Sequence, residues 1–122
     1  MSHTLVRTIL AAAVCSLGSA SLARADALFF EKVAVKTSSE ATCLRFAGDV
    51  ARNENFQNVH KNQAEVAGVK SGVYVSVTCV GRGQQGAIAV VMAVAPNFGA
   101  AQQTGRLVAD KISRITCIDS PC

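Results

Sequence analysis

Alternating apolar positions dominate residues 72–96 and predict a β-hairpin. In Val73–Cys79 every second residue is valine or cysteine, and in Ile88–Val94 every second residue is bulky and apolar. A period of two is the side-chain repeat of a β-strand. The two stretches are therefore expected to pair as antiparallel strands across the glycine-rich segment between them.

That glycine-rich segment sets the expected register of the hairpin. A type II′ turn needs glycine at its first central position, which Gly83 supplies, with Gln84 as the second. This turn pairs Cys79 with Ile88 and places the bulky residues of both strands on one face, which the rest of the chain must cover. The opposite face is then small or mildly polar and holds Tyr74, Ser76, Thr78, Ala89, Val91 and Ala93.

Apolar residues at helical spacing predict one helix before the hairpin and one after it. The first covers 41–53, and the preceding Thr37-Ser38-Ser39-Glu40 matches a capping box with Thr37 as the cap. The second covers 98–116, after the N-cap residue Asn97. The apolar stripes of the two helices are Cys43, Phe46, Ala47 and Val50 in the first, and Val108, Ile112 and Ile115 in the second.

The remaining segments complete an α+β pattern. Residues 29–36 alternate as a first strand, with Val33 and Val35 as its buried positions, the polar residues 53–62 suit a loop, and 63–69 form a weaker strand. The order is strand, helix, three-stranded meander, helix. This order predicts a two-layer sandwich, with a mainly antiparallel sheet and both helices on one face.

The N-terminal residues have the features of a secretory signal peptide. Arg7 precedes a short apolar run, and Ala23-Arg24-Ala25 is a cleavage site of the A-x-A type. The run is shorter than the roughly 20 residues of a membrane span. We therefore expect a signal peptide at 1–25, a single domain at 26–122 with no membrane span after cleavage, and a periplasmic or secreted location.

Four cysteines remain in the exported chain, and they predict two disulfides: Cys43, Cys79, Cys117 and Cys122. Four cysteines allow three pairings. The expected packing of the first helix on the hairpin favours a bond between Cys43 and Cys79, which leaves Cys117 and Cys122 to close a short terminal loop.

The charge of the exported chain gives no sign of a nucleic-acid partner. Arg7 and Arg24 leave with the signal peptide, so that ten basic and eight acidic residues remain, a net charge of +2. The basic residues are scattered along the chain and form no cluster that would bind a phosphate backbone.

No motif in the chain predicts a cofactor, a metal or a catalytic group. Gly81-x-Gly83-x-x-Gly86 matches a dinucleotide fingerprint, but that mechanism needs a helix next, and here a strand follows. His60 is the one histidine outside the signal peptide, whereas metal sites need two to four ligands. Glu54 and Glu65 are its nearest acidic residues in the sequence.

These observations favour a non-enzymatic binding or interaction module. The expected contact surface is the uncovered sheet face with the hairpin tip: Tyr74, Ser76, Thr78, Val91 and Arg82. The partner is an unknown protein or small ligand, and a homodimer is also open. The alternative is a small enzyme or metal-dependent protein that uses His60 with Glu54 or Glu65.

Two segments resemble a family of small exported bacterial proteins of unknown function. They are Tyr-Val-Ser-Val-Thr-Cys-Val-Gly at 74–81 and Val-Ala-Asp-Lys-Ile-Ser at 108–113. The resemblance implies a periplasmic setting and brings no catalytic residues with it.

Overall fold

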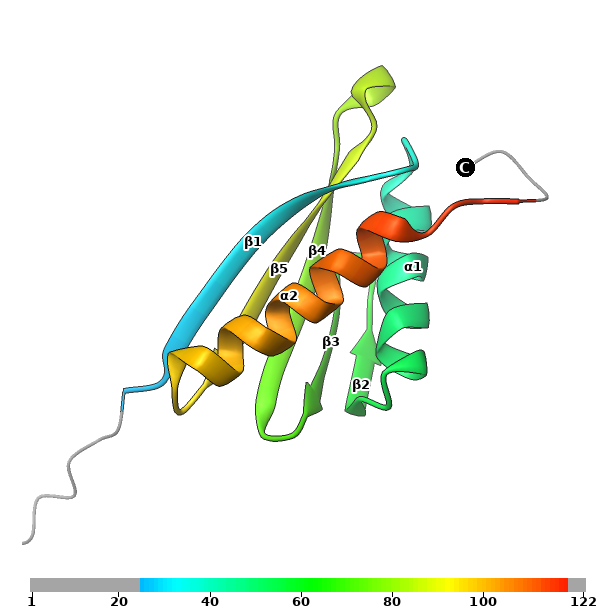
Figure 1. Ribbon diagram of the computed structural model, residues 1–122. Helices are drawn as coiled ribbons and strands as arrows, with labels where there is room; N and C mark the ends of the chain where they lie inside the picture. The colour runs from blue at the N-terminus through cyan, green and yellow to red at the C-terminus, as the bar shows by residue number, and fades with distance from the viewer. Residues whose placement is uncertain (1–24, 119–122) are drawn as a thin grey trace, which may run out of the picture.

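The segments with clear apolar periodicity form the expected α+β sandwich of two layers (Figure 1). The computed structural model describes residues 25–118, so most of the predicted signal peptide and Cys122 lie outside the described residues. Five strands form one antiparallel sheet in the order β1-β5-β4-β3-β2. The elements are β1 (Ala27–Val35), α1 (Glu40–Asn53), β2 (Gln57–Lys61), β3 (Glu65–Lys70), β4 (Val73–Gly81), β5 (Ala87–Ala95) and α2 (Phe98–Arg114).

Both helices pack on the same face of the sheet. The helix α1 contacts β3 and β4, whereas α2 contacts β1 and β5 and runs diagonally across the strands (Figure 1). The stripe predicted for α1 is buried, and Asn97 caps α2 as expected, because its side-chain oxygen accepts a hydrogen bond from the Ala100 N–H at 2.8 Å. No helix within residues 25–118 combines the length and the apolar character needed to cross a membrane.

The strand β2 was predicted as a loop, so the meander has four strands rather than three. All five residues of Gln57–Lys61 are exposed, and its pairing with β3 is irregular between Gln57 and His60. A strand at the sheet edge with no buried side chain has no apolar alternation that a sequence pattern could reveal.

The hairpin between β4 and β5 differs by one residue from the predicted register. The connection is a five-residue loop, Arg82–Gly86, instead of a two-residue turn, and Gly81 is the residue that pairs with Ala87. Gly83 and Gly86 adopt φ values of 61° and 82° in this loop, a backbone conformation that glycine accepts at little cost.

The shift by one residue turns every side chain of β5 to the other face of the sheet. Val91 pairs with Val77 and is completely buried beneath the helices, so its predicted place on the contact surface is wrong. The small residues of β5 also face the helices, and all four are buried: Ala87, Ala89, Ala93 and Ala95. The bulky residues expected in the core lie half-buried on the uncovered face: Ile88, Val90, Met92 and Val94.

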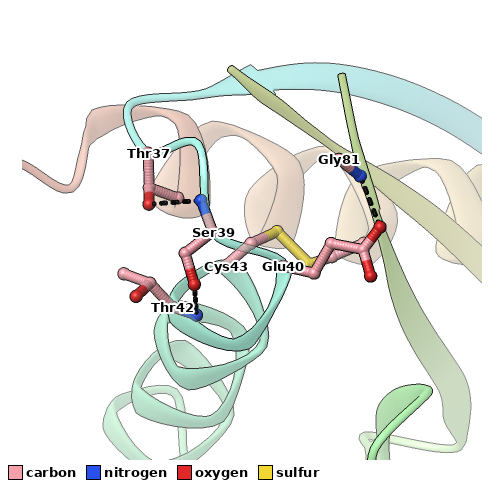
Figure 2. The surroundings of a disulfide bond; sticks show 7 residues. Thr37, Ser39, Glu40, Thr42, Cys43 and Gly81 are labelled. Carbon is pink, nitrogen blue, oxygen red and sulfur yellow. Dashed lines mark hydrogen bonds between the residues drawn. A yellow bond between two sulfur atoms is a disulfide. The ribbon is translucent and has the colours of Figure 1, made fainter. Parts of the chain in front are cut away.

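The start of α1 is fastened to the end of β4 (Figure 2). The predicted disulfide between Cys43 and Cys79 is confirmed, with Cα atoms 6.1 Å apart. Glu40 does not close the predicted capping box, since its carboxylate accepts a hydrogen bond from the Gly81 N–H at 2.7 Å. The cap is Ser39, whose hydroxyl accepts from the Thr42 N–H at 3.1 Å.

The other predicted disulfide reaches beyond the described part of the chain. Cys117 is itself disulfide-bonded. Its predicted partner, Cys122, is outside the described residues, so the pairing of Cys117 with Cys122 stays a prediction.

Candidate binding face

The sheet face turned away from both helices is the candidate site, and we call it the open face. The strand registers place four rows of side chains on this face, of which three cross β1, β5, β4 and β3 and the fourth ends at β4. From one end of the strands to the other, the rows are Leu28-Val94-Tyr74-Val69, Phe30-Met92-Ser76-Ala67, Lys32-Val90-Thr78-Glu65 and Ala34-Ile88-Val80. His60 of β2 extends the second row beyond Ala67.

Large apolar side chains on this face are left in contact with water. Leu28 is 58% exposed, Phe30 53% and Val80 50%, and Tyr74 is 41% exposed. They surround the half-buried Val90, Met92 and Val94. Contiguous apolar surface of this kind on one face is typical of sites that contact a partner.

The structure keeps three of the predicted contact residues on the open face. Tyr74, Ser76 and Thr78 alternate along β4 on the open face as predicted. Ser76 is only 4% exposed, so its side chain does not project from the face. Arg82 lies in the hairpin tip, which extends past the other strands (Figure 1), and its guanidinium donates to the Gln85 carbonyl oxygen at 3.2 Å. Arg82 is therefore separate from the apolar part of the face.

A small polar cluster borders the apolar part of the face on the β3 side. The Ser76 hydroxyl donates a hydrogen bond to Glu65 Oε2 at 2.6 Å, and His60 Nε2 lies 3.3 Å from Glu65 Oε1. The hydrogen bond from Ser76, followed by that from His60, holds the pKa of the Glu65 carboxyl below its usual range. Glu65 therefore places a negative charge at this side of the face.

This cluster is not arranged for nucleophilic catalysis. The carboxylate of Glu65 lies between the serine and the histidine, and the Ser76 hydroxyl donates its hydrogen bond to the carboxylate rather than to the imidazole ring. A carboxylate with a lowered pKa is a weak base, and Ser76 is buried, so a substrate cannot reach its hydroxyl. The two hydrogen bonds therefore fix the position of the Glu65 carboxylate, and they do not activate Ser76 as a nucleophile.

Of the two acidic residues proposed as partners of His60, only Glu65 lies beside it. Glu54 lies elsewhere, with its carboxylate oxygens 3.4 Å from Lys111 Nζ and 3.8 Å from Lys70 Nζ. Within the described chain, no three residues of the types His, Cys, Asp and Glu are grouped so that they could hold a metal ion.

Removing the Ser76 hydroxyl should raise the pKa of Glu65 toward its usual value. In Ser76→Ala the largest cause of the lowered pKa is gone, and the hydrogen bond from His60 remains. A carboxyl whose pKa is lower in the folded than in the unfolded state stabilises the fold above the unfolded pKa, and this stabilisation disappears as the pH falls through the folded pKa. The variant should therefore lose less stability on acidification than the wild type.

An NMR titration of the Glu65 carboxyl carbon measures this change directly. Ser113→Ala is the matched control, because the Ser113 hydroxyl donates to the Asp110 carbonyl oxygen on α2, away from Glu65. An unchanged Glu65 titration in Ser76→Ala would contradict the assignment of Ser76 as its main hydrogen-bond donor.

Sequence reasoning missed the most exposed apolar residues of the open face, Leu28 and Phe30. A signal for them was present in β1: if Val33 and Val35 face the helices, alternation turns Phe30 to the opposite side. Met92 and Val94 were missed because the predicted register of β5 was shifted by one residue.

Comparison with protein-family models found no match to this chain, and a search of curated protein sequences also found no similar one. The resemblance to small exported bacterial proteins therefore stays a prediction.

Proposed function

We propose that this protein is an exported binding module that acts by contact rather than by catalysis, and that its contact surface is the apolar part of the open face. The observation that carries the proposal is the exposure of bulky apolar side chains on β1 and β4, on a sheet face that neither helix covers. Exposing such groups to water is unfavourable, and covering them with a partner recovers that free energy.

The proposed location is the periplasm or the outside of the cell. The signal-peptide features of residues 1–25 support export. The Cys43–Cys79 disulfide supports an oxidising compartment, where such bonds persist. The partner is then an exported protein, a small ligand present in the same compartment, or a second copy of the chain.

A photo-crosslinking amino acid on the open face tests this proposal in the cells that make the protein. The probe is p-benzoylphenylalanine at Phe30, which replaces one exposed aromatic side chain by another. The control is the same probe at Gln103, which is exposed on α2 at the opposite side of the molecule. We expect adducts from position 30 and none of the same mass from position 103.

A second substitution links the adduct to the apolar surface itself. Thr78→Lys places a charge in the middle of the open face, directly across from Glu65, whose carboxylate attracts it. It should therefore abolish the adduct and leave the thermal unfolding of the purified protein nearly unchanged. The absence of any adduct from position 30, or identical adducts from both positions, would overturn the proposed function.

A further inference from the structure

We propose that the partner of the open face is a second copy of this chain, packed face to face about a two-fold axis that is parallel to the strands and runs between β4 and β5. This inference rests on the proposed function, since it names the partner of the same surface. It commits to one symmetric arrangement, in which each contact occurs twice.

The strand order dictates which residues meet in this arrangement. A rotation of 180° about such an axis places β5 on the partner's β4 and β1 on the partner's β3, with each row of side chains opposite the same row in reverse order. Sheets that pack face to face in this way keep their strands within about 30° of one another, as their natural twist requires.

Charge complementarity selects this axis. Lys32 is exposed on β1 and Glu65 lies on β3, at the two ends of one row. The rotation sets Lys32 of each copy opposite Glu65 of the other, so that two equivalent ion pairs border the apolar centre. An in-plane axis perpendicular to the strands would place β1 on β1 and leave Lys32 without this carboxylate.

The shapes of the side chains are complementary about the same axis. In the second row, Phe30 projects from the face, whereas Ala67 is 2% exposed and level with the sheet. The rotation sets Phe30 on Ala67, and it sets Met92 on Ser76, which is 4% exposed. In this row large side chains therefore meet small ones, which allows the two sheets to pack closely. In the first row the rotation sets Leu28 on Val69 and Val94 on Tyr74, which adds apolar contacts.

The extent of the face predicts a reversible dimer. Four strands spaced about 4.8 Å apart, over seven residues that rise about 3.4 Å each, give a footprint of roughly 450 Å² per copy. The total of roughly 900 Å² is below the standard size of a stable protein interface, about 1,600 Å². We therefore expect a dissociation constant in the micromolar range.

Sedimentation equilibrium of the exported, oxidised protein over the micromolar range tests the arrangement. The wild type should show a monomer–dimer equilibrium that weakens with added salt. Lys32→Glu and Glu65→Lys should each raise the dissociation constant by about tenfold or more, since each sets two pairs of like charges opposite one another. The double variant should return close to the wild-type value, because it restores the ion pairs in the opposite sense.

The double variant keeps the test independent of the role of Glu65 within one copy. Glu65→Lys also removes the hydrogen bonds with Ser76 and His60, so a weaker dimer in that variant alone would not identify the contact. The two single variants change the net charge in opposite directions, so a dimer that both weaken and the double variant restores identifies a contact between positions 32 and 65 rather than an effect of net charge. Arg45→Glu on the exposed side of α1 is the matched control and should leave the dimer unchanged.

The outcomes separate this inference from the proposed function. A dimer that each single variant weakens and the double variant restores, together with a position-30 adduct of twice the chain mass, supports both the proposed function and the second-copy inference. A monomer at every concentration, with a position-30 adduct to a different molecule, overturns the second-copy inference and leaves the binding module standing. A dimer whose dissociation constant is the same in Lys32→Glu, in Glu65→Lys and in the double variant overturns the proposed arrangement.

Discussion

Replacing Cys43 and Cys79 together by alanine should lower the free energy of unfolding by about 4 kcal/mol. The disulfide joins residues 36 positions apart, so it closes a long loop that contains most of α1 and all of β2 and β3. Closing a loop of this length restricts the unfolded chain strongly, and the stabilisation grows with the logarithm of the loop length.

Urea unfolding followed by circular dichroism measures this loss. The double alanine variant is preferable to reduction of the wild type, because a reductant would also open the disulfide at Cys117. The variant should unfold at a lower urea concentration, and a loss below about 1 kcal/mol would contradict the expected role of the bond in the unfolded chain.

The second large effect is expected at the crossing of α2 over the sheet, where Gly105→Ala should destabilise the protein. A Cβ atom at position 105 would lie 2.4 Å from Phe29 Cδ1 and 3.2 Å from the Cβ of Ala93. The Phe29 ring cannot move aside freely, since it is 7% exposed and lies edge to face with Phe98 at 6.2 Å between ring centroids. Overpacking costs about 3 kcal/mol, and the better helix propensity of alanine returns about 1, which leaves a net loss of about 2 kcal/mol.

The same substitution in the other helix provides the matched control. At Gly48 in α1 the nearest atom to an added Cβ is Lys61 Cδ at 4.0 Å, an ordinary van der Waals contact, so Gly48→Ala meets no clash. It should stabilise the protein by up to about 1 kcal/mol through helix propensity alone. Thermal or urea unfolding of both variants should therefore give changes of opposite sign, and a gain in stability at both positions would show that α2 does not approach the sheet as closely as described.

The helices and the fold class were predictable because their signals are strong and local. Each helix has an apolar stripe at helical spacing, and the disulfide partners Cys43 and Cys79 followed from placing the first stripe on the sheet. Capping was less predictable, since Thr37-Ser38-Ser39 offers several hydroxyl groups and the packing of α1 on β4 selects Ser39.

The register of β5 was not predictable from hydrophobicity, because both faces of this strand are apolar. Size suggested that the bulky residues from Ile88 to Val94 form the core, but α2 approaches the sheet so closely at Gly105 that small residues are needed beneath it. A tight turn and a five-residue loop fit the same glycine-rich segment equally well in sequence. The loop places Ala89 and Ala93 under the helix, which the close contact requires.

The sequence predicted which side of β4 faces away from the helices, but it predicted only some of the residues on that face. Tyr74 and Thr78 were assigned to the uncovered face on the alternation of β4, which is correct. Val91 was assigned to that face by the shifted register, and the exposed apolar residues of β1 were not considered as its neighbours. The site depends on long-range pairing between β1 and β5, which the sequence pattern of either strand alone does not specify.

The edge strand β2 limits how the sheet can grow at one of its two edges. Its exposed polar residues and the irregular pairing near Asn58, where φ is 51°, make this edge a poor template for another strand. Fibrils grow when flat, regular edges add strands without limit. The proposed contact surface of this molecule is a sheet face, and contacts through a face can close into a complex of fixed size. The irregular β2 edge does not favour the addition of further strands, so growth into amyloid from that edge is disfavoured at high concentration.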